Sequence, residues 1–232
     1  EQFEFRTSAR AVIAGTLARI IEPPISQTPS QWGAENLVVP DGPRQFERWD
    51  PTLTPYVLEP LDKMGPDDPT NEIDIRKSAQ TGFTTLALVA IGHSVDCDPA
   101  GGILLVQPTD AALADFNREK LQPAIDKTDA LARKVEPQTS RAGSGSTTYA
   151  KKYPGGILTL AIANSTADLR SKTKRKAICD EVDEYPDDLD GQGSPLDMIE
   201  ARQESFLDSG DWKRLKISTP TVDGASHIDK RF

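Results

Sequence analysis

Two segments decide the fold: Lys77-Ser-Ala-Gln-Thr-Gly-Phe-Thr-Thr85 and Ala177-Ile-Cys-Asp-Glu181. A short alternating run precedes the first and an apolar run opens the second, and both runs are typical of β-strands. The first segment has the residues of a phosphate-binding loop with its lysine displaced. The second has the pattern of a strand whose end carries a magnesium-binding aspartate and a catalytic glutamate. Together they predict an enzyme that binds and splits a nucleoside triphosphate.

The loop departs from the usual pattern G-x-x-x-x-G-K-[ST], in which backbone amides and a lysine hold the phosphates. When Gly82-Phe83-Thr84 is set on its G-K-T end, Phe83 takes the lysine position and Lys77 takes the first glycine. The stem of Lys77 can still reach the phosphates from the strand side. The alternative is a surface lysine and a buried Phe83. The predicted ATP-binding residues are Lys77, Ser78, Ala79, Gln80, Thr81, Gly82, Phe83, Thr84 and Thr85, with Thr84, or else Thr85, as the magnesium hydroxyl.

The apolar run that ends in Asp180-Glu181 predicts the acidic half of the site. Asp180 is expected to hold Mg²⁺ directly or through water, and Glu181 to act as general base toward the attacking water. Parallel strands present ligands at their carboxyl ends, so both should share an edge with the phosphate loop. Asp183-Glu184 is an alternative register, less favoured because it does not abut the apolar run. One magnesium ion cannot use all the acids nearby, and most of them are predicted to lie in a solvated loop and the approach to the next helix: Asp183, Glu184, Asp187, Asp188 and Asp190.

Strand and helix patterns alternate along the chain, which predicts an α/β fold with a doubly wound, mostly parallel sheet flanked by helices. Residues 1–55 are expected to form an N-terminal arm, helical over 1–22 and extended from about 25, and residues 56–232 to form the core. The core strands are expected near 72–76, 102–107, 151–164, 177–179 and 215–218. The core helices are expected near 55–64, 84–94, 110–121 and 194–207, and a loop over 140–148.

Bulk properties narrow the function classes. The 232 residues carry a net charge of −9, which argues against broad, static nucleic-acid binding but leaves room for a local basic groove. The basic stretch 170–176 is predicted to be a solvated connecting loop, with contact to DNA phosphate as the alternative. No run of about 18 apolar residues predicts a membrane span. Two distant cysteines, Cys97 and Cys179, offer no zinc pattern and favour a reduced, intracellular protein.

An ordered series of motifs identifies a family resemblance. From about Trp49 to the C-terminus, the chain resembles the lambda-type large subunit of tailed-phage terminase, the DNA-packaging motor. The motifs that carry the resemblance are Lys77-Ser-Ala-x-x-Gly, Gln107-Pro108-Thr109, Ala163-Asn164-Ser165, Leu169-Arg170-Ser171, Asp180-Glu181-Val-Asp-Glu-Tyr185-Pro186, Gly193-Ser194-Pro195 and Ser218-Thr219-Pro220.

The resemblance implies a RecA-like P-loop ATPase of the additional-strand (ASCE) class, in which a displaced lysine such as Lys77 is a recognised variant. Ser218-Thr219-Pro220 stands where the family has its coupling motif, which senses γ-phosphate loss; an ordinary strand end is the alternative. Tyr56 lies where the family contacts adenine and is expected to stack on the base or to be a buried structural residue. Arg76 and Arg170 are the candidates for an arginine finger in cis, and a neighbouring subunit is the other source.

The resemblance also implies Mg²⁺ and ATP as cofactors and a place in the host cell cytoplasm with no membrane contact. The implied partners are double-stranded DNA, a small terminase subunit, the portal protein and sister subunits in a ring. Because the chain stops at Phe232, we expect no nuclease domain in it. Two alternatives remain at this point: a helicase-like or remodelling ATPase, and a non-catalytic assembly module whose Phe83 marks a degenerate loop.

Overall fold

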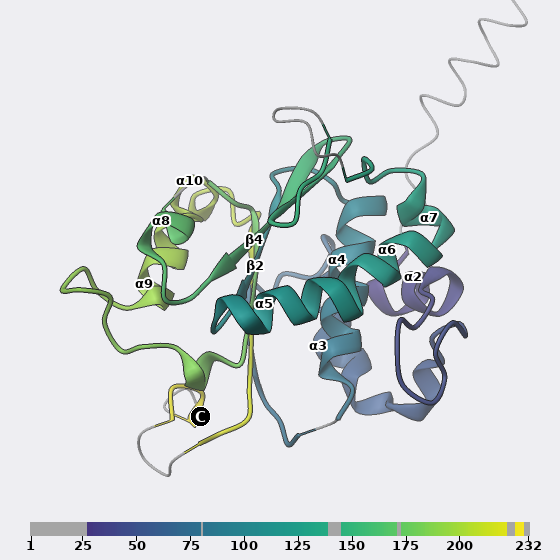
Figure 1. Cartoon of the computed structure of the whole chain (residues 1–232), viewed down its shortest axis with the longest axis horizontal. Helices are drawn as coiled ribbons and strands as arrows, with labels where there is room; N and C mark the ends of the chain where they lie inside the picture. The colour runs from purple at the N-terminus through teal and green to yellow at the C-terminus, as the bar shows by residue number, and fades with distance from the viewer. Residues whose placement is uncertain (1–26, 80, 139–144, 171–172, 222–225, 230–232) are drawn as a thin grey trace, which may run out of the picture.

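The computed structural model describes residues 27–79, 81–138, 145–170, 173–221 and 226–229 (Figure 1). Within them, six strands form one sheet in the order β1-β6-β5-β2-β4-β3. All neighbours run parallel except β3, which pairs antiparallel with β4. The predicted mostly parallel sheet is therefore confirmed. The strands are β1 (Glu72–Arg76), β2 (Ile103–Gln107), β3 (Ala150–Tyr153), β4 (Gly156–Ile162), β5 (Lys176–Asp180) and β6 (Lys213–Ser218).

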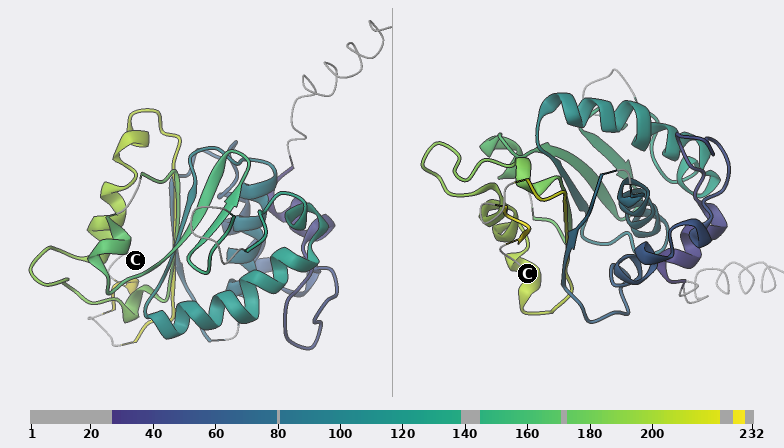
Figure 2. Two further views of the ribbon diagram at one scale, coloured as in Figure 1. Left: turned by 45° about the horizontal axis from the view of Figure 1, so that its top comes forward. Right: turned by 90° about the horizontal axis from the view of Figure 1, so that it is seen from below.

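Helices cover both faces of the sheet (Figure 2). Along β2, Ile103 and Leu105 join the larger hydrophobic cluster, while Leu104 and Val106 join the smaller one on the other face. This alternation is expected of a strand buried on both sides. The helices on the face of the larger cluster are α2 (Pro29–Asn36), α3 (Leu58–Asp62), α4 (Phe83–Asp96), α5 (Asp110–Phe116), a π-helical turn (Asn117–Leu121), α6 (Gln122–Lys127) and α7 (Asp129–Ala132). The helices on the other face are α8 (Thr166–Leu169), α9 (Pro195–Ala201) and α10 (Glu204–Leu207). None of the helices in the described residues is long and apolar enough to cross a membrane.

The sequence predicted that the N-terminal arm is extended from about residue 25, but the structure places helix α2 within it. Thr28 caps α2, and a reciprocal bond from Gln31 completes a capping box. The indole of Trp32 on α2 is fully buried against Gly92 of α4, where an added Cβ would lie 2.2 Å from Cη2 of the indole. The arm is therefore an integral part of the core from α2 onward. The helix predicted over 1–22 lies outside the described residues.

The helix predicted over 194–207 is interrupted. Ser194 caps α9 as expected, but the chain leaves the helix before Gln203 and resumes in α10. The Gln203 side chain is fully buried, and its Nε2 donates to the backbone carbonyls of Arg175 and Lys213. A buried amide that joins the starts of β5 and β6 thus accounts for the interruption.

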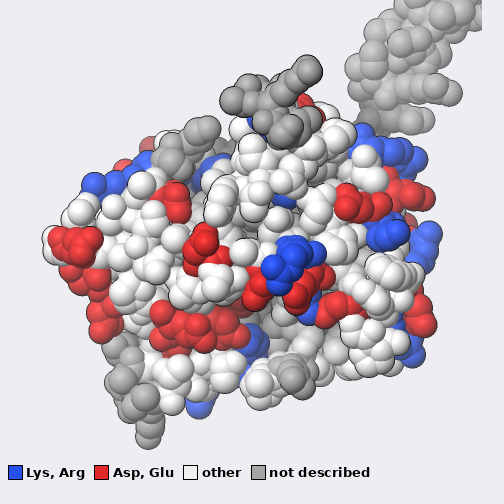
Figure 3. Space-filling model, viewed as in Figure 1, with Lys and Arg blue, Asp and Glu red and all other residues white. Residues whose placement is uncertain are grey.

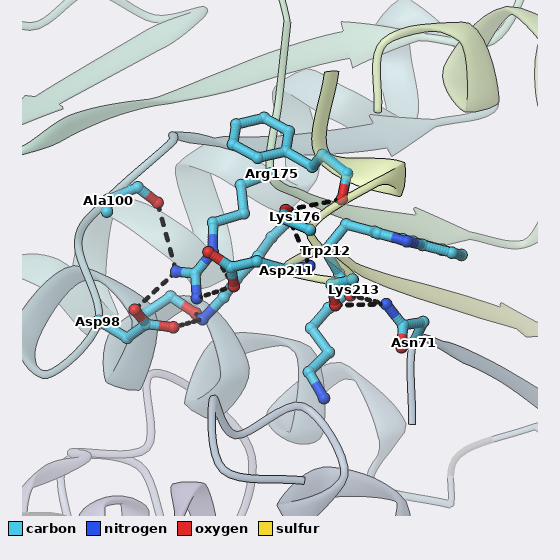
Figure 4. A network of polar contacts seen from close by, with 12 residues as sticks. Asn71, Asp98, Ala100, Arg175, Lys176, Asp211, Trp212 and Lys213 are labelled. Atoms are coloured by element: carbon cyan, nitrogen blue, oxygen red, sulfur yellow. Dashed lines mark hydrogen bonds and ion pairs between the residues drawn. The ribbon is translucent and has the colours of Figure 1, made fainter. Parts of the chain in front are cut away.

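The basic stretch 170–176 was predicted to be a solvated loop, and from Lys174 onward this prediction is wrong. Arg175 and Lys176 are buried and both bind Asp98, with Nη1 2.6 Å from Oδ1 and Nζ 2.7 Å from Oδ2 (Figure 4). Burial raises the pKa of Asp98, but the two cations outweigh burial and hold the pKa below its ordinary value. Arg175 also binds Asp211. These cations are neutralised inside the protein, so they are not available to DNA phosphate.

Asp98→Ala should lower the free energy of unfolding by about 3–5 kcal/mol, because it leaves two buried cations without their common partner. The side chain of Asp98 is 13% exposed, whereas that of Asp211 is 55% exposed. Asp211→Ala is therefore the matched control, with an expected loss of about 1 kcal/mol or less. Urea denaturation of both variants measures the difference, and equal losses would contradict the assignment of Asp98 as the central acid.

Candidate functional site

Polar residues meet at the carboxyl edge of the sheet, where sheet order and register place them side by side. Strand β6 lies between β1 and β5, and Arg76 pairs with Ser218 while Asp180 pairs with Ile217. The residues that follow these strand ends must therefore emerge together. The amide of Lys77 extends the ladder by donating to the Ser218 carbonyl at 2.9 Å.

Lys77, Glu181 and Thr219 form a closed set of contacts at this edge. Lys77 Nζ lies 2.5 Å from Glu181 Oε1 and 3.1 Å from Thr219 Oγ1. The Thr219 amide donates to Glu181 Oε2 at 3.1 Å. The Lys77 side chain is only 10% exposed and that of Glu181 31% exposed. We call this set the edge triad; in it the displaced lysine and the predicted general base are in direct contact.

The backbone of Glu181 turns sharply as it leaves β5. Its φ of 50° and ψ of 54° lie in the left-handed region, which residues other than glycine rarely occupy. Such a conformation costs about 1–3 kcal/mol and persists when surrounding contacts enforce it. Here the Glu181 carboxylate is held by Lys77 and Thr219. The strain is consistent with a functional position, since such residues cluster at active sites.

Asp180 ends β5 and is half-buried beside the edge triad. Burial raises the pKa of its carboxyl, as does the charge of Glu181; a hydrogen bond from Gln107 and the charge of Lys77 act in the opposite direction without cancelling the rise. Gln107, at the end of β2, donates from Nε2 to Asp180 Oδ2 at 3.1 Å. An ionised carboxylate that is costly to bury is a good partner for a cation. The arrangement fits a magnesium ligand.

Gln107 is a site residue to which sequence reasoning had assigned no role. It ends the run Ile103–Gln107, which is buried along its whole length. A polar residue that closes an apolar strand at the ligand-bearing edge was the signal available in the sequence. No signal in the sequence indicated that its partner is Asp180, which lies 73 positions away.

The loop between β1 and α4 ends at Gly82, whose φ is +80°. A Cβ at this position would lie 3.2 Å from the methyl carbon of Thr54. Glycine therefore suits both the positive φ of the backbone and the limited space beside Thr54. Helix α4 begins at the next residue, and the amides of its first turn lack partners within the helix, which favours an anion there. Thr84 is exposed in that turn and Thr85 is half-buried.

A cleft of about 330 Å³ lies between this loop and the segment before β1. Tyr56 stands at the loop as well: it is 54% exposed, its hydroxyl donates to the Thr81 carbonyl at 3.0 Å, and its ring centroid lies 6.1 Å from that of Phe83. The alternative that Tyr56 is a buried structural residue is therefore wrong. Phe83 is partly buried against the core. The cleft is lined by Val39, Asp41, Pro43, Arg44, Arg48, Trp49, Asp50, Leu53, Thr54, Gly82 and Thr85.

The other predicted residues take separate positions. The guanidinium of Arg76 lies 3.0 Å from Asp229, and Arg170 is exposed near α8. Among the described residues, no contact joins either arginine to the edge triad. Ser218 is fully buried and Pro220 half-buried at the end of β6. Gln80 lies outside the described residues, which hold no group of three or more His, Cys, Asp or Glu side chains suited to a metal.

Comparison with solved structures bears on the fold. The crystal structure of the HK97 bacteriophage large terminase superposes with a TM-score of 0.66 at 15% sequence identity, over 88% of this chain and 40% of that one. At this identity the likeness shows the fold alone. This chain therefore shares the fold of that protein, a RecA-like P-loop fold.

Comparison of sequences gives the family. Two curated relatives, each named as a terminase large subunit, are 27% identical over 226 residues (Enterobacteria phage P21) and 25% identical over 210 residues (Escherichia phage lambda). They cover 96% and 89% of this chain, which spans only 34% and 31% of their own lengths. The family model described as phage terminase large subunit gpA, ATPase domain, matches residues 44–232. This chain therefore belongs to the family of phage terminase large subunit ATPase domains.

Proposed function

We propose that this domain binds Mg-ATP at the carboxyl edge of its sheet and hydrolyses it, and that hydrolysis drives double-stranded DNA into a phage procapsid as part of a longer terminase subunit. The observation that carries the proposal is the edge triad, in which Lys77 contacts Glu181 and Thr219 beside Asp180. A relocated ammonium, a strand-end carboxylate pair and a helix N-terminus are the parts that phosphoryl transfer to water needs.

The ammonium of Lys77 neutralises the Glu181 carboxylate across a contact of 2.5 Å. A γ-phosphate carries more charge than one carboxylate and competes for the same ammonium. When Lys77 turns to the phosphate, the Glu181 carboxylate loses its cation and becomes available to accept a proton from water. The side chain that binds the phosphate thereby also releases the base, so binding and activation are linked.

Asp180 would hold Mg²⁺, with the hydroxyl of Thr84, or alternatively of Thr85, as its second protein ligand. One or two carboxylates are usual for Mg²⁺ in ATPase sites, where substrate phosphates and water complete the shell. When bound, the ion neutralises charge on the phosphate oxygens. Gln107 orients Asp180 through its hydrogen bond to Oδ2.

The cleft beside the loop is the proposed site of the nucleoside. Gly82 and Thr85 line it together with Trp49 and Leu53, so one cavity touches both the phosphate loop and an apolar wall. Tyr56 stands at the loop, is 54% exposed and is the proposed stacking partner of the base.

Ser218, Thr219 and Pro220 are the proposed coupling residues, since Thr219 contacts both Lys77 and Glu181. On the face seen in Figure 3, acidic side chains gather on the left, and near the centre and on the right basic side chains lie beside acidic ones, which favours brief rather than static contact with DNA. A ring of sister subunits would supply an arginine finger, as neither Arg76 nor Arg170 reaches the triad. The small terminase subunit and the portal protein are the further proposed partners.

Titration of Mg²⁺ at saturating ATP tests the site, with Asp180→Asn as the variant. We expect the Mg²⁺ concentration for half-maximal hydrolysis to rise by about 10- to 100-fold, as when metal ligation is weakened. The raised pKa of Asp180 means that its ionised form costs stability, a cost absent below the unfolded pKa and growing as pH rises through the folded pKa. The metal-free variant should therefore melt above wild type at pH 7. An unchanged Mg²⁺ requirement would remove Asp180 from the metal site.

A further inference from the structure

The side chain of Asp183 accepts hydrogen bonds from the chain that follows the coupling residues. Its Oδ2 accepts the Thr221 amide at 3.1 Å and the Thr221 hydroxyl at 3.4 Å. Its Oδ1 accepts the Ile228 amide at 2.9 Å. One carboxylate therefore binds the chain on both sides of the stretch between these two residues. Asp183 is half-buried and is thus the exception to the solvated loop predicted for most of these acids, whereas the acids after it are exposed: Glu184, Asp187, Asp188 and Asp190.

The backbone of Asp183 is fixed to the same region. Its amide donates to Ser218 Oγ at 3.0 Å, and Ser218 is fully buried. Two residues earlier, Glu181 Oε2 accepts the Thr219 amide. Strand β6 and the segment after it are thus joined to the turn that carries the proposed base through three groups: the Glu181 carboxylate, the Asp183 amide and the Asp183 carboxylate.

The charge of Asp183 suits this position. Burial raises the pKa of its carboxyl, but hydrogen bonds from Ser226, Ile228 and Thr221 and the nearby His227 outweigh burial and hold the pKa below its ordinary value. An ionised carboxylate accepts hydrogen bonds only, and its partners here are donors. Thr221 and Ile228, whose amides it satisfies, lie outside the helices and strands named above.

We propose that Asp183 is a positioning residue that ties the segment after Thr219 to the Glu181 turn, so that movement of the Glu181 carboxylate on nucleotide binding is passed to that segment. The inference rests on the proposed function of the edge triad. Asp183 touches no proposed substrate atom; it acts through Thr219 and Glu181, whose separation it limits. Small misplacements of a catalytic group lower turnover strongly, by as much as about 10²-fold for 1 Å.

The test compares Asp183→Asn with Glu184→Gln in the whole 232-residue chain. Asparagine keeps the size of the side chain but turns an NH₂ group toward one of the donors. Glu184 is the adjacent acid and is exposed, so its amide variant is the matched control. We expect Asp183→Asn to speed hydrogen exchange of the Thr221 and Ile228 amides at least tenfold without nucleotide. We expect kcat for Mg-ATP to fall about tenfold with KM within twofold, and Glu184→Gln to match wild type.

Each outcome decides the inference. Unchanged exchange, or faster exchange with unchanged kcat, overturns the positioning role, and so does an equal effect of Glu184→Gln. If Asp183→Asn does not unfold cooperatively, Thr221→Pro takes its place, because it removes both Thr221 donors to Asp183 and leaves the acidic turn intact. Exchange is then measured at the Ile228 amide, and the same fall in kcat is expected. A wild-type chain that fails to hydrolyse Mg-ATP overturns the proposed function itself, whereas an active wild type with an equally active Asp183→Asn variant overturns this inference alone.

Discussion

Replacing Lys77 with methionine is expected to lower ATP hydrolysis by about 10³-fold. Methionine keeps the length and the apolar stem but removes the ammonium that contacts Glu181 and Thr219. Loss of one preorganised donor to a developing oxyanion costs about 10²–10³ in kcat, and a full charge on a phosphate lies at the upper end of that range. Steady-state phosphate release with saturating Mg-ATP measures the effect.

Lys63→Met is the control for this change. Lys63 is partly exposed and pairs with Glu59 on the surface of α3, so its removal should leave the rate within twofold. The Lys77 variant should unfold cooperatively, because Glu181 keeps the Thr219 amide as a partner. A Lys77→Met protein that hydrolyses ATP at nearly the wild-type rate would show that the positive charge comes from elsewhere and that the loop is of another kind.

Glu181→Gln should keep nucleotide binding and lower turnover by about 10²–10⁴-fold. The single amide oxygen of glutamine accepts the Thr219 amide as the carboxylate does, while its NH₂ group faces the Lys77 ammonium and favours the turn of that ammonium toward the phosphate. An amide cannot take a proton from water, and so the base is lost while the phosphate contacts remain. Single-turnover hydrolysis, together with equilibrium binding of a fluorescent ATP analogue, separates the two effects.

Glu184→Gln distinguishes the two registers of the acidic strand end. Glu184 is exposed and belongs to the second Asp-Glu step, so its substitution should leave hydrolysis unchanged. If Glu184→Gln were inactive and Glu181→Gln active, the general base would be misassigned by three positions. The contact of Glu181 with Lys77, 104 positions away in sequence, favours the first register.

Much of the fold was predictable because its signals are local. The buried strand β2 and the long helix α4 occur where apolar runs indicated them, and Lys77 and Glu181 lie directly after predicted strands. An edge shared by parallel strands then brings those two residues together by rule. Their roles in ATP hydrolysis stay predictions.

The predictions that were wrong or incomplete concern residues whose contacts lie far away in the sequence. Lys176 belongs to a run of charges that usually lies in solvent, yet Asp98, far away in sequence, neutralises it inside the protein. Asp183 was grouped with exposed acids because its partners on the chain after β6 are invisible in the local pattern. Gln203 interrupts a helix to satisfy two carbonyls from different strands. In each case a single tertiary partner outweighs what composition favours.

The position of β6 also governs when a newly made chain can complete its site. Strand β1 pairs only with β6 in the described residues, although some 140 residues separate them: Lys77 and Thr219 are 142 positions apart. In a chain emerging from the ribosome, the backbone edge of β1 therefore stays without its partner until β6 has been translated and inserts between β1 and β5. The lysine, the glutamate and the threonine meet only at that late step, so a nascent chain released before residue 213 lacks the strand that lies between β1 and β5 at the edge triad.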